Sequence, residues 1–192
     1  MRIVRQLTQE SWHQFLNAQN HANIFQLPEI LDMYKATKNN KPIFLAVVDD
    51  DESILGTLLA VIQKEHSGLL GRFSSRAVLW GAPLIRDASP EVLDFILKEY
   101  NKLVNSKAIY TQFRNLWEWN EQEKEIFKIN GYNYEAHLDI LIDLQQSPAS
   151  LFDSIQKTGR YNIKRAERIP LQFVEIEDDS EFDQCYRLIA NT

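Results

Sequence analysis

Residues 43–63 read IFLAVVDDDESILGTLLAVIQ, and this segment sets the topology of the chain. Two apolar runs, Ile43–Val48 and Ile54–Gln63, flank the acidic tetrapeptide Asp49–Glu52. Runs of this length separated by a short polar turn are typical of paired antiparallel strands. The sequence therefore predicts an early hairpin with a solvated turn. The alternative for the four carboxylates is a divalent-cation site, but they lack the spacing of a calcium loop.

Further strands and helices are expected on both sides of the hairpin, because helix caps, proline positions and apolar periodicity recur along the chain. In chain order they are a strand at Val4–Leu7, a helix capped by Thr8, a helix beginning at Pro28, the hairpin, a strand at Ala77–Trp80, a helix capped by Ser89, a strand at Ala108–Phe113, a helix at Glu121–Ile129 and a strand at Tyr134–Leu144.

This order of elements indicates an α/β (α+β) fold with a mixed sheet. Doubly wound folds alternate more regularly and do not start with a hairpin. The layout resembles the acyl-CoA N-acyltransferase (GNAT-like) fold of the acetyltransferase superfamily.

Composition excludes several classes of protein. The 192 residues include 21 Lys and Arg against 27 Asp and Glu, so the net charge of −6 argues against coating nucleic acid through charge alone. Cys185 is the only cysteine, which excludes an internal disulfide and a multi-cysteine zinc site. No apolar run is long enough to span a bilayer, and residues 1–10 have no apolar core of a signal peptide. We expect a cytoplasmic protein without a bound metal.

One pattern occurs twice. Val4–Leu16 and Phe173–Ile189 each read as a strand, a polar turn and an amphipathic helix. We therefore expect a first lobe at 1–147, a basic helical segment at 148–170, and the truncated start of a second lobe at 171–192. A longer chain is expected to be more soluble, because it would cover the apolar face of this second unit.

The segment Ser150–Arg168 carries the clearest functional signal. Written as one helix ended by Pro170, it places Lys157, Arg160, Lys164 and Arg168 on one face, with Tyr161 among them and Arg165 at the edge. Residues 157–168 hold five basic side chains and one acidic one, a local charge of +4. Arginine and tyrosine suit phosphate oxygens, so we interpret this face as a phosphate site. The alternative is a solvated charged face.

Four stretches of the chain carry a family resemblance. Leu151–Phe152 with Lys157–Glu167 resembles the motif of the FemAB family, the peptidoglycan-bridge aminoacyltransferases. Asn23–Pro28, Tyr110–Asn115 and Gly131–Ile140 are similar to other parts of that family. The family has two acetyltransferase-like lobes, and this chain looks like the first lobe followed by the beginning of the second.

The resemblance implies transfer of an aminoacyl or acyl group to an amine of a phosphate-bearing, lipid- or nucleotide-linked cell-wall precursor. It requires no cofactor, and the co-substrate is aminoacyl-tRNA or acyl-CoA. Such a reaction needs an amine aligned with an activated ester or thioester and donors for the oxyanion. The phosphate-binding candidates are Lys35, which matches a family position, and Lys157, Arg160, Tyr161, Lys164 and Arg165. Arg114, near Trp117 and Trp119, and His137 are candidates for a cleft wall; core packing is the alternative for the tryptophans and for His137. No catalytic base is assigned.

The sequence also departs from acetyltransferases. The Gln/Arg-x-x-Gly-x-Gly/Ala loop that holds coenzyme A is absent after Ala77–Trp80, where Gly81-Ala82-Pro83 stands instead. A coenzyme A-dependent N-acetyltransferase is therefore the third choice. The second is a non-catalytic lobe that binds substrate for a partner or for the missing second lobe.

Overall fold

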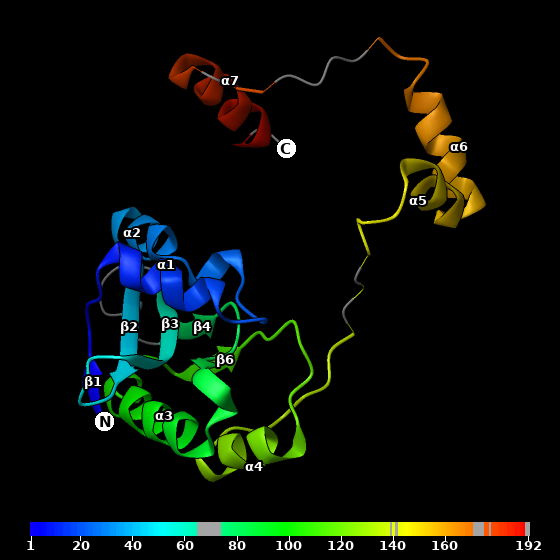
Figure 1. Cartoon of the computed structure of the whole chain (residues 1–192). Coiled ribbons are helices and arrows are strands. Elements are labelled where there is room, and N and C mark those ends of the chain that lie inside the picture. The colour runs from blue at the N-terminus through cyan, green and yellow to red at the C-terminus, as the bar shows by residue number, and fades with distance from the viewer. Residues whose placement is uncertain (65–73, 139, 141, 171–174, 177, 191–192) are drawn as a thin grey trace. The chain divides into compact units, whose positions relative to one another are not determined.

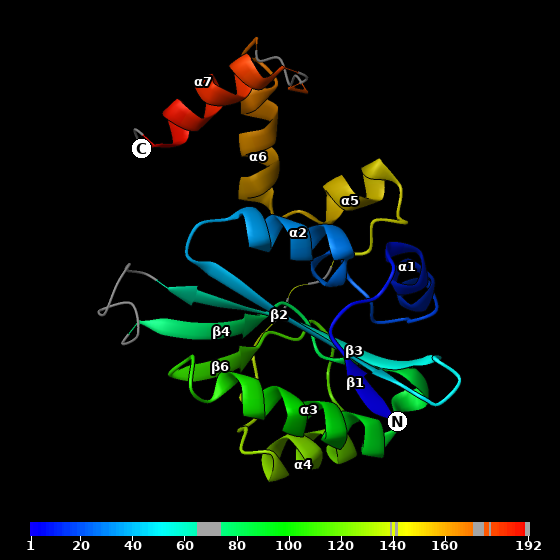
Figure 2. The ribbon, with the colours of Figure 1, turned by 90° about the vertical axis from the view of Figure 1, so that its left-hand side faces the viewer.

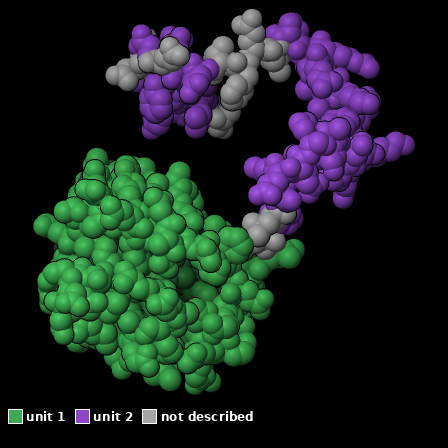
Figure 3. All heavy atoms as spheres, viewed as in Figure 1, with its two compact units in different colours: residues 1–139 green, residues 140–192 purple. Residues whose placement is uncertain are grey.

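The computed structural model describes residues 1–64, 74–138, 140, 142–170, 175–176 and 178–190 (Figure 1). The chain divides into two compact units, Met1–Asp139 and Ile140–Thr192, coloured separately in Figure 3. Each unit is described by itself.

Unit 1 is built on a six-stranded mixed sheet with the order β1-β2-β3-β4-β6, and β5 pairs with β3 beside this path. The β4–β6 pair is parallel and all other pairs are antiparallel. The strands are β1 (Arg2–Val4), β2 (Asn40–Val48), β3 (Ile54–Lys64), β4 (Ser75–Leu79), β5 (Leu84–Ile85) and β6 (Tyr110–Phe113). The predicted hairpin is β2–β3, and the predicted α/β class with a mixed sheet is confirmed.

Helices cover both faces of this sheet, as Figure 2 shows, with α1 and α2 on one side and α3 and α4 on the other. They are α1 (Gln9–Asn17), the 3-10 helix η1 (Ile24–Gln26), α2 (Pro28–Ala36), the 3-10 helix η3 (Arg86–Ala88), α3 (Pro90–Val104) and α4 (Glu121–Ile129). In β2, Phe44, Ala46 and Val48 face the first layer, whereas Leu45 and Val47 face α3. Burial on both faces explains why the strand is apolar throughout rather than alternating.

The helices begin where the sequence predicts them. The Thr8 hydroxyl accepts a hydrogen bond from the Ser11 N–H, and the Ser89 hydroxyl accepts one from the Val92 N–H. Pro28 and Pro90 occupy the first turns of α2 and α3, where a missing N–H costs nothing. Gly131 follows α4 with a φ of 89°, as expected for a residue just past a helix end.

The described residues of unit 2 form three helices, α5 (Pro148–Ser154), α6 (Lys157–Ala166) and α7 (Asp179–Ala190). The prediction of one continuous helix over 150–168 is wrong, because Ile155 is extended with a ψ of 137°. The Ile155 N–H bonds to the Phe152 carbonyl and the Ser154 hydroxyl to the Leu151 carbonyl, so local bonds end α5 there. The second helix ends at Ala166, four residues before Pro170.

Two strand predictions also need correction. The first strand is Arg2–Val4 rather than Val4–Leu7, so it pairs with the end of β2. The described residues of the predicted strand Tyr134–Leu144 form no strand. Leu138 and Ile140 are 88% and 82% exposed, because apolar alternation stabilises a strand only where a neighbouring strand and a covering layer are present.

The predicted repeat is visible in part. Its second helix is α7, while Phe173 and Val174 of its expected strand lie outside the described residues. The three-part division of the chain stays a prediction. Among the described helices, none combines the length and apolar character needed to cross a bilayer.

Candidate functional site

Two of the four resemblance motifs meet at one edge of the sheet. Because β4 and β6 are parallel, their carboxyl ends lie together, with Leu79 opposite Phe113. The Arg114 N–H continues the pairing by donating to the Leu79 carbonyl at 2.8 Å. The segment Asn23–Gln26 contacts the chain that leaves β4.

Arg114 and Trp80 form the centre of this edge. The guanidinium carbon of Arg114 lies 4.4 Å from the centroid of the Trp80 ring, and the Phe25 ring lies 5.5 Å from that ring on centroids. Arg114 Nε donates to Gln112 Oε1 at 3.1 Å, and Arg114 forms no ion pair with any described carboxylate. The guanidinium is half-buried against an aromatic face, and Gln112 uses only its Nε donor. Its remaining N–H groups can bind a phosphate, a carboxylate or a developing oxyanion.

A capping box holds the other side of this edge in place. The Asn23 side chain accepts from the Phe25 N–H, and Gln26 Oε1 accepts from the Asn23 N–H at 2.9 Å. Buried Gln26 then donates through Nε2 to the Ala82 carbonyl at 2.7 Å. Gly81 has a φ of 135°, and a Cβ there would lie 2.8 Å from Asn23 Nδ2. Glycine at this position therefore allows η1 to approach closely the residues that follow β4.

A hollow of about 640 Å³ lies beside this edge. Its lining includes His21, Asp87, Asn115, Glu118 and Glu123. The His21 ring stacks on Trp117 with 5.2 Å between centroids. These three carboxylates stand against Arg86 in the same lining, and Glu118 is 3.7 Å from Lys124 Nζ. The remaining negative charge of the hollow favours a cationic group such as an ammonium.

The amino end of α3 does not fit the diphosphate of coenzyme A. In the acetyltransferase arrangement, free N–H groups at a helix N-terminus hold phosphate oxygens. Here Pro90 has no N–H, and the Ser89 hydroxyl already occupies the Val92 N–H. Hydrogen bonds from the backbone N–H of Glu91 and from Ser89 lower the pKa of the Glu91 carboxyl, so a negative charge stands where a phosphate would bind.

The basic candidates of unit 2 lie on α6. Tyr161 is 66% exposed, and Lys157, Lys164 and Arg165 are exposed as well. Arg160 Nη1 donates to the Asp153 carbonyl at 2.5 Å, and Lys164 Nζ lies 5.8 Å from the Phe152 ring centroid. These two contacts connect α6 to α5. None of the four basic side chains pairs with a carboxylate among the described residues, so their charge is available to an anion.

The other predicted residues lie elsewhere. Lys35, in the last turn of α2, forms an exposed ion pair with Asp32 at 2.8 Å. His137 is exposed in the irregular segment after α4, so the expectation of a packed histidine on a strand is wrong. Trp119 stacks on Phe127 at 4.0 Å in the core, as the packing alternative expected, whereas Trp117 is 44% exposed and does not fit that alternative. The described residues hold no cluster of three His, Cys, Asp or Glu that could bind a metal ion.

Sequence reasoning missed Gln26, Trp80 and Gln112 as parts of this edge. The pattern Asn-x-x-Gln at 23–26 indicates a capping box in the sequence alone. Its contact with Gly81 and Ala82 spans more than fifty residues and has no local signal.

Comparisons with known proteins support the fold. No protein-family model and no curated protein matches this sequence. A mutant of the BH1408 protein from Bacillus halodurans is similar in structure with a TM-score of 0.50 at 12% identity, covering 75% of this chain and 100% of its own.

Two further solved structures have titles that name an acetyltransferase. A probable acetyltransferase has a TM-score of 0.45 at 13% identity and covers 77% of this chain and 100% of its own. An aminoglycoside antibiotic 6'-N-acetyltransferase from Acinetobacter haemolyticus has a TM-score of 0.49 at 12% identity and covers 74% of this chain and 98% of its own. At such identities the likeness concerns the fold alone.

Proposed function

We propose that this chain contains the first lobe of a FemAB-like N-acyltransferase, which transfers an aminoacyl or acyl group to an amine of a phosphate-bearing acceptor, such as a cell-wall precursor. One observation carries the proposal. The guanidinium of Arg114, which forms no ion pair with a described carboxylate, lies on Trp80 where two motifs that resemble the family converge. The mixed sheet and its structural neighbours support the fold that such an enzyme needs.

The reaction itself needs no covalent enzyme intermediate. The acceptor nitrogen attacks the carbonyl carbon of an activated ester, a C–N bond forms, and the C–O bond to the leaving alcohol breaks. The nitrogen loses a proton and the leaving oxygen gains one, so the step balances without a redox partner. The role left to the protein is to align the two reactants and stabilise the oxyanion.

Three features of the described residues suit that role. Arg114 supplies N–H donors for an oxyanion or a phosphate, and Trp80 fixes its orientation. The carboxylates that line the neighbouring hollow outnumber Arg86 and leave it a negative charge that attracts an ammonium group. In unit 2, the basic side chains of α6 suit the phosphates of the acceptor or of an aminoacyl-tRNA donor.

A thermal-shift comparison tests the proposal on the full chain. We expect a uridine-diphosphate precursor or aminoacyl-tRNA to stabilise the protein, whereas acetyl-coenzyme A has no effect. The double variant Arg160→Ala/Lys164→Ala is expected to reduce that response. A matched control is Lys98→Ala/Lys128→Ala, which removes two lysines that are ion-paired on α3 and α4.

Stabilisation by acetyl-coenzyme A alone would overturn the proposal in favour of a coenzyme A-dependent enzyme. A response to none of the three ligands would favour a non-catalytic lobe. Equal loss in the α6 variant and in its control would show that the α6 cations do not bind the ligand.

A further inference from the structure

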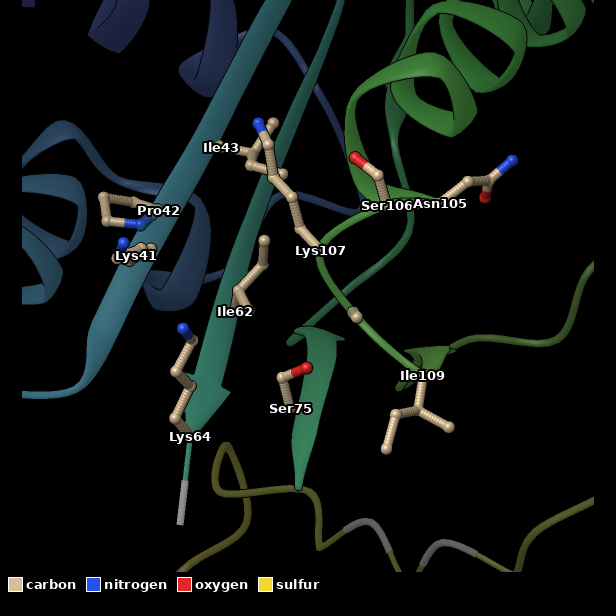
Figure 4. Close-up of a pocket in the computed structure, with 11 residues that line it drawn as sticks. Lys41, Pro42, Ile43, Ile62, Lys64, Ser75, Asn105, Ser106, Lys107 and Ile109 are labelled. Carbon is tan, nitrogen blue, oxygen red and sulfur yellow. The ribbon is translucent and has the colours of Figure 1, made fainter. Parts of the chain in front are cut away.

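A second pocket lies at the opposite end of β4, away from Arg114 and Trp80. It has a volume of about 540 Å³ and is bounded by the starts of β2 and β4, the end of β3 and the loop 105–109 between α3 and β6. Figure 4 shows its lining. None of its residues belongs to the site already described.

The pocket exists because α3 is shorter than the sheet that it covers. Val92, in the first turn of α3, lies over Gly56, where an added Cβ would be 3.2 Å from Val92 Cγ1. From Val92 to its last residue Val104, α3 rises about 18 Å, which corresponds to about five or six residues of a strand. Counted along β3 from Gly56, the helix ends near Ile62, so the face of the sheet beyond it is left uncovered.

Three lysines surround this uncovered end. Lys41 projects from β2, Lys64 from the last position of β3 and Lys107 from the loop before β6, with Ile62 among them (Figure 4). Lys41 is opposite Ile62 in the β2–β3 register, so Lys64 is its diagonal neighbour on the same face. The lysines therefore come from three separate segments but share one pocket.

No described carboxylate neutralises these charges. Lys41, Lys64 and Lys107 form no ion pair and no side-chain hydrogen bond with described residues. Like charges held close together on one face of a sheet are destabilising, and an anion bound between them would relieve that repulsion. Ser106 and Asn105 add polar groups at the rim, whereas Pro42, Ile43 and Ile109 add apolar surface.

We infer that this pocket binds a small organic phosphate, with its phosphate groups between Lys41, Lys64 and Lys107 and its body against the exposed side chain of Ile109. Three cationic side chains select the anion, and the apolar surface accounts for the organic part. The volume suits a ligand of nucleotide size. Neither Arg114 nor α6 contributes to this pocket, so a ligand bound here is independent of the proposed function.

Calorimetric titration of the full chain at low ionic strength tests the site, with inorganic diphosphate and adenosine diphosphate as probes. We expect both to bind, with adenosine diphosphate the tighter, and Lys64→Gln/Lys107→Gln to weaken both by about tenfold or more. Lys98→Gln/Lys128→Gln is the matched control, because it removes the same charge from lysines outside the pocket. The control is expected to bind as the unchanged protein does.

Nuclear magnetic resonance provides a readout that does not depend on a variant. Adenosine diphosphate is expected to shift the amide signals of residues 105–109 and not that of Arg114. Absence of binding, or equal weakening in both double variants, overturns the site. Equal affinity for the two probes would contradict the claim that the pocket binds the organic part of the ligand. A single-stranded RNA that binds this pocket more tightly than adenosine diphosphate would replace the small molecule as its ligand.

Discussion

The guanidinium of Arg114 lies over the ring of Trp80, 4.4 Å from its centroid, and this contact joins the ends of two parallel strands. The two residues are 34 positions apart and meet only because the β4–α3–β6 crossover brings both strand ends to the same edge. Arg114 has donors left after its bond to Gln112. We therefore expect Arg114 to contribute more to ligand binding than to the stability of the fold.

Replacement of Arg114 by methionine is expected to separate these two roles. The change should lower the free energy of unfolding by about 1 kcal/mol or less, because a cation–π contact that stays partly in solvent contributes little. It should abolish the thermal shift with the phosphate-bearing acceptor. Arg5→Met removes the same charge at an exposed position and should keep the shift. A retained ligand response in the Arg114 variant would argue against the proposed site.

Gly81 and Gly131 offer a matched pair of glycines with positive φ. Gly81→Ala should lower the free energy of unfolding by about 2–4 kcal/mol, because the new Cβ both strains the backbone and displaces Asn23 and Gln26 from their hydrogen bonds. Gly131→Ala should cost about 1–2 kcal/mol, since no atom lies within 4 Å of its Cβ position. Urea unfolding measures both, and equal losses would contradict the close approach of η1 to Gly81.

Tyr132 is expected to affect stability at alkaline pH. Burial against Phe113 raises the pKa of the Tyr132 phenol to about 12. The unfolded chain releases this proton near pH 10 and the folded chain releases it later, so the stability present below pH 10 is lost as the pH rises toward 12. Tyr132→Phe should make the decline in the free energy of unfolding between pH 10 and 12 shallower. An unchanged slope would show that the Tyr132 phenol is not protected from ionisation.

Leu138 and Ile142 test whether the predicted last strand exists in solution. Both side chains are largely exposed, so Leu138→Ser/Ile142→Ser should change the free energy of unfolding by less than about 0.5 kcal/mol. Ile96→Ser, at a buried position of α3, should cost more than about 3 kcal/mol. A loss of several kcal/mol in the first variant would show that residues 134–144 form a packed strand after all.

The candidate site was predictable only in part. The sequence predicts that the basic side chains of α6 share one face, because residues three and four apart in a helix are neighbours whatever surrounds the helix. The sequence also places Arg114 at the end of a predicted strand. Its contact with Trp80 was not predictable, since aromatic residues carry no signal that tells a cleft wall from core, and Trp119 in fact packs in the core.

The sequence by itself determined the elements whose signals are local. Thr8, Ser89, Pro28 and Pro90 set the starts of helices through backbone bonds within a few residues, and the run 43–63 specified an antiparallel hairpin. Only the tertiary structure decided whether Tyr134–Leu144 is a strand, because a strand needs a partner that its own residues do not supply. The tertiary structure alone also decided the two pockets and the Arg114–Trp80 contact. The pocket at the start of β4 depends on where α3 ends, and the hollow and the Arg114–Trp80 contact depend on the parallel pairing of β4 with β6.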